Sequence, residues 1–469
     1  MFRKKKYKLR LTTFFLFIFL FVINTGCYNN KKKSNENNAS KDLPQLKEEG
    51  RIKVVTLYSS TSYFQYRMEP MGYEYDLISD FARSQGLKLE IKVAENSGRL
   101  IEMLESGEAD VVAYPLQITN ERKQRVLFCG EETHSTQVLI QRANRGDKIL
   151  KDVTDLIGKE VHVKSHTRYA ERLKSLNEEL GGGIQITDVE KDTITSEDLI
   201  ESVSRGGIAY TVSDDKTARL NKTYFQNINV NLPISFMQRS SWVVRKSSPE
   251  LAKAIDEWAS GNTSQQRIRA ITKRYFELSK QPFESTIPEV IDGRISPYDD
   301  LFKTHAPTLE WDWQLIASIS YQESHFNPSV VSWAGAQGLM GVMPNTARAF
   351  DVDPSQLNDP ETGILTGIAC LRRFRNGFSE IEDPLEKMKF TLASYNAGIG
   401  HIYDAQRLAE KYGKDPKKWD ENVAEFVRLK NDPEYYNDPV CKHGYLRGSE
   451  TYKYVFEVLQ RYAYYKKNT

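Results

Sequence analysis

The apolar positions divide the chain into two regions of different character. Between residues 51 and 276, short apolar or alternating stretches such as 51–58 and 87–94 are followed by amphipathic helical stretches such as 73–86. Strands that alternate with helices predict an α/β unit with mainly parallel sheets. Beyond Leu301 the apolar residues recur almost only at helical spacing, which predicts a mainly α region. A chain of 469 residues is also too long for one core, so at least two domains are expected.

Polar or proline-containing segments mark the borders of these regions. Residues 28–48 are rich in lysine and asparagine and lack periodicity, so we expect a flexible tether there. A proline-containing connection over residues 279–294 is expected to be a linker. The predicted organisation is therefore an N-terminal segment over 1–27, the tether, an α/β domain over 49–278, the linker and a mainly α domain over 295–469.

One acidic residue stands on an apolar helical stripe. Ile316, Ile319 and Glu323 fall at i, i+3 and i+7, so they share one face of a predicted helix. A carboxylate that faces a core is unfavourable unless it is paired or protonated. Burial raises the pKa of a carboxyl group, so Glu323 is a candidate general acid near neutral pH. The alternative interpretation is a helix-end glutamate whose head group reaches back to water.

The first residues resemble a bacterial lipoprotein signal. A basic stretch precedes an apolar run from Phe14 to Ile23, which is shorter than the roughly 20 residues that cross a bilayer. The run ends at Thr25-Gly26-Cys27, and the resemblance implies that Cys27 carries a lipid anchor. Asn24 departs from the pattern, which usually has an aliphatic residue there, and an uncleaved anchor is the alternative. Both interpretations place the protein at a membrane of the cell envelope, and the resemblance implies the outer membrane, facing the periplasm.

Composition narrows the classes of partner and cofactor. Lys and Arg total 65 and Asp and Glu total 63, which gives a formal net charge of +2 and no basic stripe for nucleic acid. Cys129, Cys370 and Cys441 show no CxxC spacing. We therefore expect no nucleic acid partner, no disulfide framework, no metal and no organic cofactor.

Motifs in the α/β region carry a first family resemblance. The stretches GYEYDL, GEADVVA, ITNERKQRVLF and GGIAYTVSD follow one another as in family 3 solute-binding proteins, the periplasmic amino-acid receptors. The resemblance implies a bilobed α/β periplasmic-binding-protein-like domain that holds an amino acid or muropeptide ligand between its lobes. It assigns the ligand carboxylate to Arg122 and the ligand ammonium to Asp214, which suits a guanidinium fork and a lone carboxylate.

Both assigned residues have structural alternatives. Arg122 lies in a charged run, and most such charges form a solvated face. Asp214 precedes a predicted helix and could cap it. The family usually has Gly-Thr where this chain has His166-Thr167, so ligand contacts from that loop are not carried over.

Four ordered motifs in the helical region carry a more specific resemblance. ESHFNP, SWAGAQGLMGVMPNTA, ASYNAGIGHI and SETYKYVFEVL have the order and spacing of the lytic transglycosylase domain of the soluble-lytic-transglycosylase type. The resemblance implies a C-terminal mainly α, goose-lysozyme-like domain that acts on peptidoglycan glycan strands. It makes Glu323 the single catalytic acid and base, and it assigns substrate contacts or support of the site to Ser332, Met340, Tyr395, Asn396 and Glu450. Core packing is the alternative for Met340 and Tyr395.

A single catalytic carboxylate indicates a particular reaction. Most glycosidases use two carboxyl groups. One suffices if the 6-hydroxyl of N-acetylmuramic acid attacks its own C1, which gives a 1,6-anhydromuramyl end without water. Gly341 replaces a glutamine that is usual in the family, so one sugar-binding amide is missing. The alternatives are a lysozyme-type hydrolase of the same substrate and a catalytically inactive envelope receptor. Fusion to a binding domain further predicts that a ligand regulates the enzyme.

Overall fold

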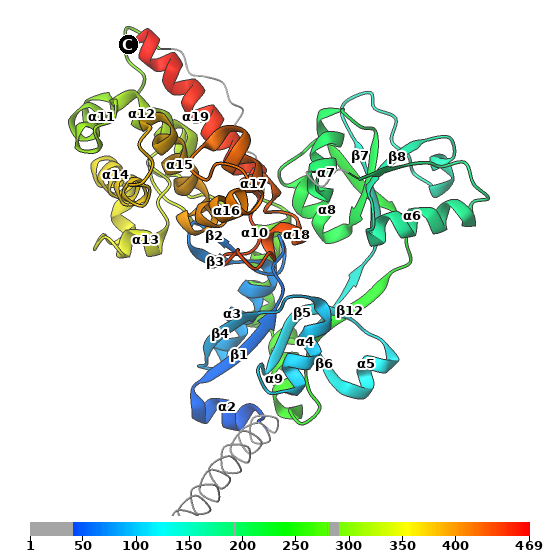
Figure 1. The fold of residues 1–469 in the computed structure, drawn as a ribbon. Coiled ribbons are helices and arrows are strands. Elements are labelled where there is room, and N and C mark those ends of the chain that lie inside the picture. The colour runs from blue at the N-terminus through cyan, green and yellow to red at the C-terminus, as the bar shows by residue number, and fades with distance from the viewer. Residues whose placement is uncertain (1–40, 191–193, 279, 281–289) are drawn as a thin grey trace, which may run out of the picture. The chain divides into compact units, whose positions relative to one another are not determined.

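A computed structural model describes residues 41–190, 194–278, 280 and 290–469 (Figure 1). The chain forms two compact units. The first contains the described residues up to 57 together with 78–133 and 239–265, and the second contains 58–77, 134–238 and 266–469. The units therefore divide the α/β region between them, and the second unit combines part of that region with the helical region.

The first unit is built on a five-stranded sheet with the order β4-β1-β5-β12-β6. Strand β1 runs parallel to β4 and β5, and β12 is antiparallel to β5. Ile52, Val54 and Val55 of β1 are fully buried, as expected of a strand covered on both faces. The strands are β1 (Arg51–Thr56), β4 (Lys88–Val93), β5 (Val111–Gln117), β6 (Val126–Ser135) and β12 (Gln238–Arg245), and the helices are α2 (Leu43–Glu49), α3 (Tyr73–Ser84), α4 (Ser97–Glu105), α5 (Asn120–Arg125) and α9 (Pro249–Ser260).

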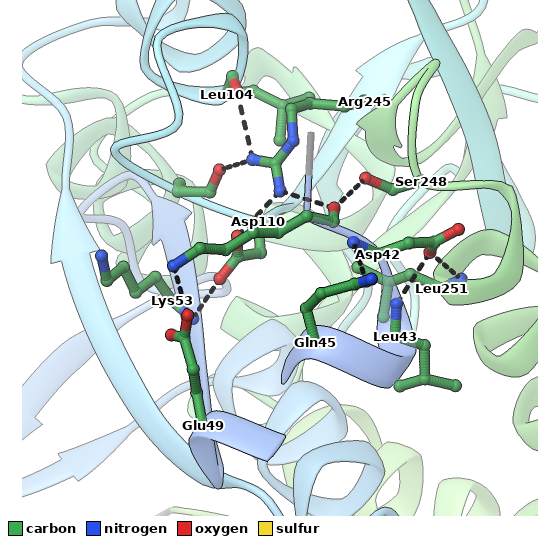
Figure 2. A network of polar contacts seen from close by, with 12 residues as sticks. Asp42, Leu43, Gln45, Glu49, Lys53, Leu104, Asp110, Arg245, Ser248 and Leu251 are labelled. Atoms are coloured by element: carbon green, nitrogen blue, oxygen red, sulfur yellow. Dashed lines mark hydrogen bonds and ion pairs between the residues drawn. The ribbon is translucent and has the colours of Figure 1, made fainter. Parts of the chain in front are cut away.

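The described chain begins with a docked helix where a flexible tether was predicted. The prediction is wrong for residues 43–48, because α2 is helical there. The Asp42 carboxylate accepts the backbone N–H of Leu43 at 2.8 Å, of Glu250 at 3.0 Å and of Leu251 at 2.8 Å (Figure 2). Asp42 therefore caps α2 and α9 together, a long-range contact that the local composition of the tether does not indicate.

A buried arginine completes this attachment. Arg245 pairs with Asp110 at 2.8 Å and donates to the Lys41 carbonyl at 3.2 Å (Figure 2). The Ser248 hydroxyl donates to the same carbonyl at 2.7 Å. These bonds fix the start of the described chain to the first unit.

The second unit contains another five-stranded sheet, with the order β11-β7-β10-β8-β9. Strand β10 is antiparallel to β7 and parallel to β8, and β8 is parallel to β9. Leu173 and Leu176 of α6 share a buried cluster with Val161 and Val212 of the sheet. The elements are β7 (Gln137–Arg142), η1 (Val153–Leu156), β8 (Glu160–Lys164), α6 (Arg168–Glu179), β9 (Gln185–Val189), α7 (Ser196–Arg205), β10 (Tyr210–Asp214), α8 (Asp215–Lys222) and β11 (Ile228–Pro233).

The helices of the helical part of the second unit share a hydrophobic core. Ile316 and Ile319 are completely buried in it, and both lie on α12. Helices α12 and α19 pack against each other, and α15 packs against α14, α16 and α19. The elements are α10 (Asn262–Phe276), α11 (Asp299–His305), η2 (Ala306–Leu309), α12 (Trp313–Ser324), α13 (Pro344–Arg348), η3 (Pro354–Asn358), α14 (Pro360–Asn376), α15 (Pro384–Ala397), α16 (Ile399–Lys411), η4 (Trp419–Val423), α17 (Ala424–Leu429), α18 (Pro433–Tyr436) and α19 (Gly448–Asn468).

A short hairpin from the α/β region also belongs to the second unit. Strand β2 (Phe64–Tyr66) pairs antiparallel with β3 (Glu69–Met71). The two turn residues, Arg67 and Met68, have φ of +51° and +67°. Such turns usually contain Asn-Gly, because left-handed backbone costs other residues roughly 1–2 kcal/mol each. The contacts of the hairpin with its surroundings must offset this strain.

No helix in the described part of the chain has the length and apolar character needed to cross a membrane. Within the same residues, no three or more His, Cys, Asp or Glu side chains are grouped so that they could hold a metal ion. The predicted lipidation site, Cys27, lies outside the described residues.

Candidate active site

Glu323 occupies the last turn of α12, where the sequence predicted a buried carboxyl group. The helix ends at His325, which has a left-handed backbone with φ of +50°. The side chain of Glu323 is only 6% exposed. The predicted burial is confirmed, and it follows from the apolar stripe of Ile316 and Ile319 that turns this face of the helix toward the core.

Two side chains hold the Glu323 carboxylate. The Tyr454 hydroxyl donates to Oε1 at 2.9 Å, and Arg67 Nη2 lies 2.9 Å from both carboxylate oxygens. Burial raises the pKa of Glu323 above its ordinary value. The charge and hydrogen bonds of Arg67 and the hydroxyl of Tyr454 oppose that rise. Without Arg67, the pKa of Glu323 would therefore be higher still.

Gly341 makes room for this arrangement. Its φ is +59°, and a Cβ atom there would lie 2.2 Å from Glu323 Oε2 and 3.0 Å from Glu323 Cδ. Its carbonyl accepts a hydrogen bond from Arg67 Nη1 at 2.6 Å. The residue that departs from the family pattern is therefore in direct contact with the candidate acid, and a side chain in its place would require the carboxyl group to move.

Tyr395 and Met340 belong to the floor of the site. The Tyr395 hydroxyl donates to the Met340 carbonyl at 2.7 Å, and the tyrosine is 5% exposed. The Met340 side chain is completely buried and packs beside Gly367. The structure thus places Met340 in the core, as the alternative interpretation had it, and its backbone carbonyl is what positions Tyr395.

Asn396 and Ser332 lie on two further segments that the sequence assigned to the site. Asn396 Oδ1 accepts a hydrogen bond from the Thr451 hydroxyl at 2.8 Å. Its amide nitrogen makes no hydrogen bond within the described chain. Ser332 Oγ accepts the backbone N–H of Ala336 at 3.0 Å, which closes the loop after α12. Asn396 thus has donor capacity left for a ligand.

Glu450 lies in the first turn of α19 and lines a pocket together with Asn396 and Thr451. Burial raises the pKa of Glu450, and the charges of Arg447 and Arg67 oppose the rise. Its carboxylate has no hydrogen bond to any other described side chain or backbone group. The predicted support of the site is therefore not exerted through a hydrogen bond among the described residues.

Arg122 and Asp214, the predicted ligand contacts, lie in different compact units. Arg122 on α5 donates to the Gln117 carbonyl at 2.9 Å. Asp214 accepts the backbone N–H of Thr217 at 2.8 Å and so caps α8, as its alternative interpretation predicted. Its second oxygen accepts the Tyr169 hydroxyl at 2.9 Å. Asp214 is therefore already engaged, although capping does not prevent a carboxylate from accepting a further donor.

A buried charged cluster supports the hairpin that carries Arg67. His401 Nε2 lies 3.0 Å from the Gln65 carbonyl on β2, and His401 Nδ1 lies 3.2 Å from Lys430 Nζ. Lys430 pairs with Asp404 at 2.5 Å, and both side chains are completely buried. A neutral His401 that donates to Gln65 and accepts from Lys430 satisfies both contacts. The cluster thus links the helical core to the backbone of the hairpin.

Sequence reasoning missed the two direct partners of Glu323. Tyr454 stands on the apolar face of α19, four residues before Val458, so its periodicity could have indicated burial. Arg67 precedes Glu323 by 256 residues and has no local signal of function. Only the consecutive left-handed residues of its turn, which appear in the structure alone, mark it as unusual.

Comparisons with known proteins agree with both resemblances. Residues 51–278 match bacterial extracellular solute-binding proteins of family 3, and residues 300–418 match the transglycosylase SLT domain. A protein of Desulfosudis oleivorans named membrane-bound lytic murein transglycosylase F is 33% identical over 91% of this chain and 92% of its own length. A protein of the same name from Pseudomonas fluorescens is 30% identical over 94% of this chain and 88% of its own length.

Solved structures of solute-binding proteins are similar to about half of this chain. An ancestral cationic amino-acid solute-binding protein is 22% identical and has a TM-score of 0.43, over 50% of this chain and 99% of its own. A mutant of ArgBP from T. maritima is 22% identical with a TM-score of 0.37, over 50% of this chain and 98% of its own. The predicted fold class, an α/β periplasmic-binding-protein-like region followed by a mainly α domain, is confirmed.

Proposed function

Since this chain belongs to the membrane-bound lytic murein transglycosylase F family, we propose that it cleaves the β-1,4 bond between N-acetylmuramic acid and N-acetylglucosamine in peptidoglycan and leaves 1,6-anhydromuramyl ends. The observation that carries the proposal is the buried Glu323 carboxyl, whose pKa is raised and whose Oε1 accepts the Tyr454 hydroxyl. A carboxyl that keeps its proton toward neutral pH is what the leaving glycosidic oxygen needs.

Glu323 acts twice in this reaction. It first gives its proton to the leaving oxygen of N-acetylglucosamine, and the resulting carboxylate then accepts the proton of the muramyl 6-hydroxyl as that oxygen attacks C1. Tyr454 keeps the carboxyl oriented through its 2.9 Å hydrogen bond. Asn396 and Ser332 contribute polar groups for the sugar, while Tyr395 and Met340 fix the floor of the site. No second carboxylate is required.

The enzyme is held inactive by the β2–β3 hairpin. In this arrangement the Arg67 guanidinium occupies both oxygens of the group that must face the glycan. The Arg67 charge also opposes the rise in the pKa of Glu323, which works against the acid form. The strained turn supports this role, because a backbone conformation of that kind persists where surrounding contacts impose it. Activation therefore requires the hairpin to withdraw.

The solute-binding region supplies the signal for withdrawal. Its ligand is an amino acid or a muropeptide such as a stem-peptide fragment, with Arg122 gripping the carboxylate and Asp214 receiving the ammonium. The protein acts in the cell envelope, where its membrane-bound relatives belong. Lipidation of Cys27 anchors it there, in the outer membrane and facing the periplasm.

The test is mass spectrometry of the soluble products that the full chain releases from purified peptidoglycan, beside its Glu323→Gln variant. Anhydromuramyl products from the parent and none from the variant are expected. Both proteins are also prepared with Arg67→Asn, so that a locked enzyme is not mistaken for an inactive one. Circular dichroism verifies that each variant is folded.

Other products would identify one of the alternatives. Reducing ends that disappear with Glu323→Gln would make the protein a lysozyme-type hydrolase. A complete lack of products, with Arg67→Asn included, would make it an inactive receptor for amino acids or peptides.

A further inference from the structure

The helix that carries Tyr454 begins at a largely buried arginine. Arg447 is the N-cap residue of α19, and its side chain is 13% exposed. Arg447, Thr451 and Tyr454 stand at i, i+4 and i+7, so they share one face of the helix. On that face the Tyr454 hydroxyl donates to Glu323 at 2.9 Å. The start of α19 is therefore connected to the candidate acid over about two helical turns.

The Arg447 guanidinium contacts the solute-binding region. Its Nη2 donates to Asn221 Oδ1 at 2.9 Å, and its Nη1 lies 3.3 Å from Glu197 Oε2. The guanidinium also stacks on Tyr224, with Cζ 3.8 Å from the ring centroid. All of these residues lie in the second compact unit. Contacts to the face and to two edges of a planar guanidinium hold it in one orientation.

Asn221 continues the connection along α8. Its Nδ2 donates to the Thr217 carbonyl at 2.9 Å, and Asn221 is completely buried. The Thr217 N–H donates in turn to Asp214 Oδ1 at 2.8 Å, which caps the helix. A series of hydrogen bonds therefore runs from Asp214, the predicted contact of a ligand ammonium, to Arg447.

This series does not include the β2–β3 hairpin, since none of its residues lies between 64 and 71. The backbone hydrogen bonds of an α-helix make it stiff over two turns. The direction of α19 at Arg447 therefore determines where Tyr454 lies. A contact of this kind between the solute-binding region and Glu323 does not depend on a docked hairpin.

We propose that Arg447 is a positioning residue, which through its bond to Asn221 holds Tyr454 against Glu323. A change at Asp214 thereby reaches the candidate acid along α8 and α19. The inference rests on the proposed function, because the roles of Asp214 in ligand binding and of Glu323 in cleavage come from it. It goes further in naming a second connection between the two sites, beside the hairpin.

The ionisation of Glu323 is measurable at residue 454 without turnover. The full chain is prepared with 3-fluorotyrosine in place of Tyr454, and the fluorine NMR shift is recorded against pH. Comparison with the same chain carrying Glu323→Gln isolates the part of the titration that belongs to Glu323. Because the Tyr454 hydroxyl opposes the rise in the pKa of Glu323, a weaker hold on Tyr454 moves the midpoint to higher pH.

Asn221→Leu removes the bond to Arg447 without a change of charge. We expect the midpoint to rise by about half a pH unit, an about threefold change in the ionisation constant. Arg447→Lys keeps the charge, but one ammonium group does not span both Asn221 and Glu197, so a similar rise is expected. The double variant is expected to shift no further than the larger single shift, because both changes remove the same bond.

Asn227→Leu is the matched control. Asn227 Nδ2 donates to the Ser204 carbonyl at 2.9 Å, and Oδ1 accepts the Ser204 hydroxyl at 2.7 Å. These bonds are like those of Asn221 but stay within the solute-binding region. The midpoint of this variant is expected to equal that of the parent.

Asp214→Ala tests the far end of the series. Loss of the cap loosens the first turn of α8, so the midpoint is expected to rise here too. The direct electrostatic effect has the opposite sign, because removal of a negative charge lowers the pKa of a carboxyl. An unchanged or lower midpoint would overturn the connection to the ligand site.

Equal midpoints in the parent, Asn221→Leu and Arg447→Lys would overturn the role of Arg447, and so would an equal rise in Asn227→Leu. Thermal melting verifies the fold of each variant, and Arg447→Lys alone decides if Asn221→Leu is not folded. The proposed function is tested separately, because a parent that releases no anhydromuramyl products still gives the fluorine titration.

Discussion

Immediate neighbours determine the position and the pKa of the Glu323 carboxyl. Burial raises its pKa, Tyr454 orients one oxygen, and Gly341 leaves no atom where a Cβ would collide. The glycine at position 341 removes a family contact to sugar and also leaves room for the Glu323 carboxyl beside its backbone. The Glu323 carboxyl and the Gly341 carbonyl can therefore bind the same Arg67 guanidinium.

Gly341→Ala is expected to reduce activity more than stability. The left-handed backbone costs alanine roughly 1–2 kcal/mol, and the new methyl group displaces the carboxyl that it would meet at 2.2 Å. We expect at least a tenfold loss of kcat, because small displacements of a catalytic group have large effects on rate. Gly335→Ala is the control, since Gly335 has φ of +94° but nothing within 4 Å of its Cβ position. A control that loses as much kcat would contradict this explanation.

Residue patterns predicted the burial of Glu323 but only some of its surroundings. The i, i+3, i+7 spacing placed Glu323 correctly, because helix periodicity alone turns it toward the core. In α19 the apolar spacing of Val455, Val458, Leu459 and Tyr462 indicates one helix face, but Tyr454 and Arg461 are more deeply buried than Leu459 and Tyr462. Packing against neighbouring helices rotates the buried face in this way, and the sequence of α19 alone does not show it.

The β2–β3 hairpin carries Arg67, which contacts both oxygens of the Glu323 carboxylate. Arg67→Asn keeps a residue that tolerates positive φ but removes the guanidinium. We expect kcat/KM to rise severalfold on purified peptidoglycan. Because Arg67 opposes the rise in the pKa of Glu323, its removal raises that pKa further and keeps the acid form to higher pH. The alkaline limb of the kcat/KM profile is therefore expected to move to higher pH.

Arg348→Ala is the control for this prediction, since Arg348 is an arginine of the helical region that does not contact Glu323. An Arg67→Asn variant with lower kcat/KM and an unmoved alkaline limb would make Arg67 a substrate contact, and the locking role would be lost. The kcat/KM profile is the informative one, because it reports the free enzyme.

The helices α16 and α17 depend on a buried ion pair. Burial acts to raise the pKa of Asp404, but the hydrogen bonds of His443 and Lys430 and the charge of Lys430 outweigh it, so the pKa is lowered. A carboxyl whose pKa is lower in the folded state stabilises the fold above its unfolded pKa, about 3.9, and loses that contribution as the pH falls. Asp404→Asn is expected to cost about 3–5 kcal/mol, because Lys430 stays buried without its counter-charge.

Chemical denaturation at pH 5 and pH 3 measures this effect, because these values bracket the unfolded pKa. The parent should lose stability between the two pH values, and Asp404→Asn should lose less. Asp415→Asn, which removes a surface carboxylate that is 3.9 Å from Lys418, is the control and should change little. Equal stability of parent and Asp404→Asn would contradict the assigned role.

At the scale of the whole molecule, the sequence predicted the domain types but not how the chain divides into compact units. The alternation of strands and helices was sufficient to predict an α/β domain, and the helical spacing of apolar residues was sufficient to predict a mainly α domain. The grouping of β7 to β11 with the helical region depends on contacts such as Arg447 with Glu197 at 3.3 Å and Lys164 with Asp432 at 2.6 Å. These pairs are separated by hundreds of residues, and ordinary surface charges in a sequence give no sign of such partners.

A ligand of the solute-binding region is expected to change turnover of the full chain. We expect a stem-peptide fragment to bind and to raise release of soluble products, and Arg122→Ala to abolish both effects at the same peptide concentration. Arg125→Ala on the same helix is the control, since that arginine is already paired with Glu105 at 2.6 Å. Peptide that neither binds the parent nor changes its turnover would remove the regulatory role.

The contact between Arg67 and Glu323 also affects glycan affinity, through the fraction of molecules in which the hairpin is withdrawn. If a glycan binds only molecules with the hairpin withdrawn, its apparent Kd equals the intrinsic Kd divided by the withdrawn fraction. With about one molecule in a hundred withdrawn, the glycan binds about a hundredfold more weakly than the open site allows. Reversing that ratio requires a signal that favours the withdrawn form about 10⁴-fold, or about 5.5 kcal/mol. A ligand that binds equally tightly to the docked and the withdrawn form would not increase peptidoglycan cleavage at any concentration.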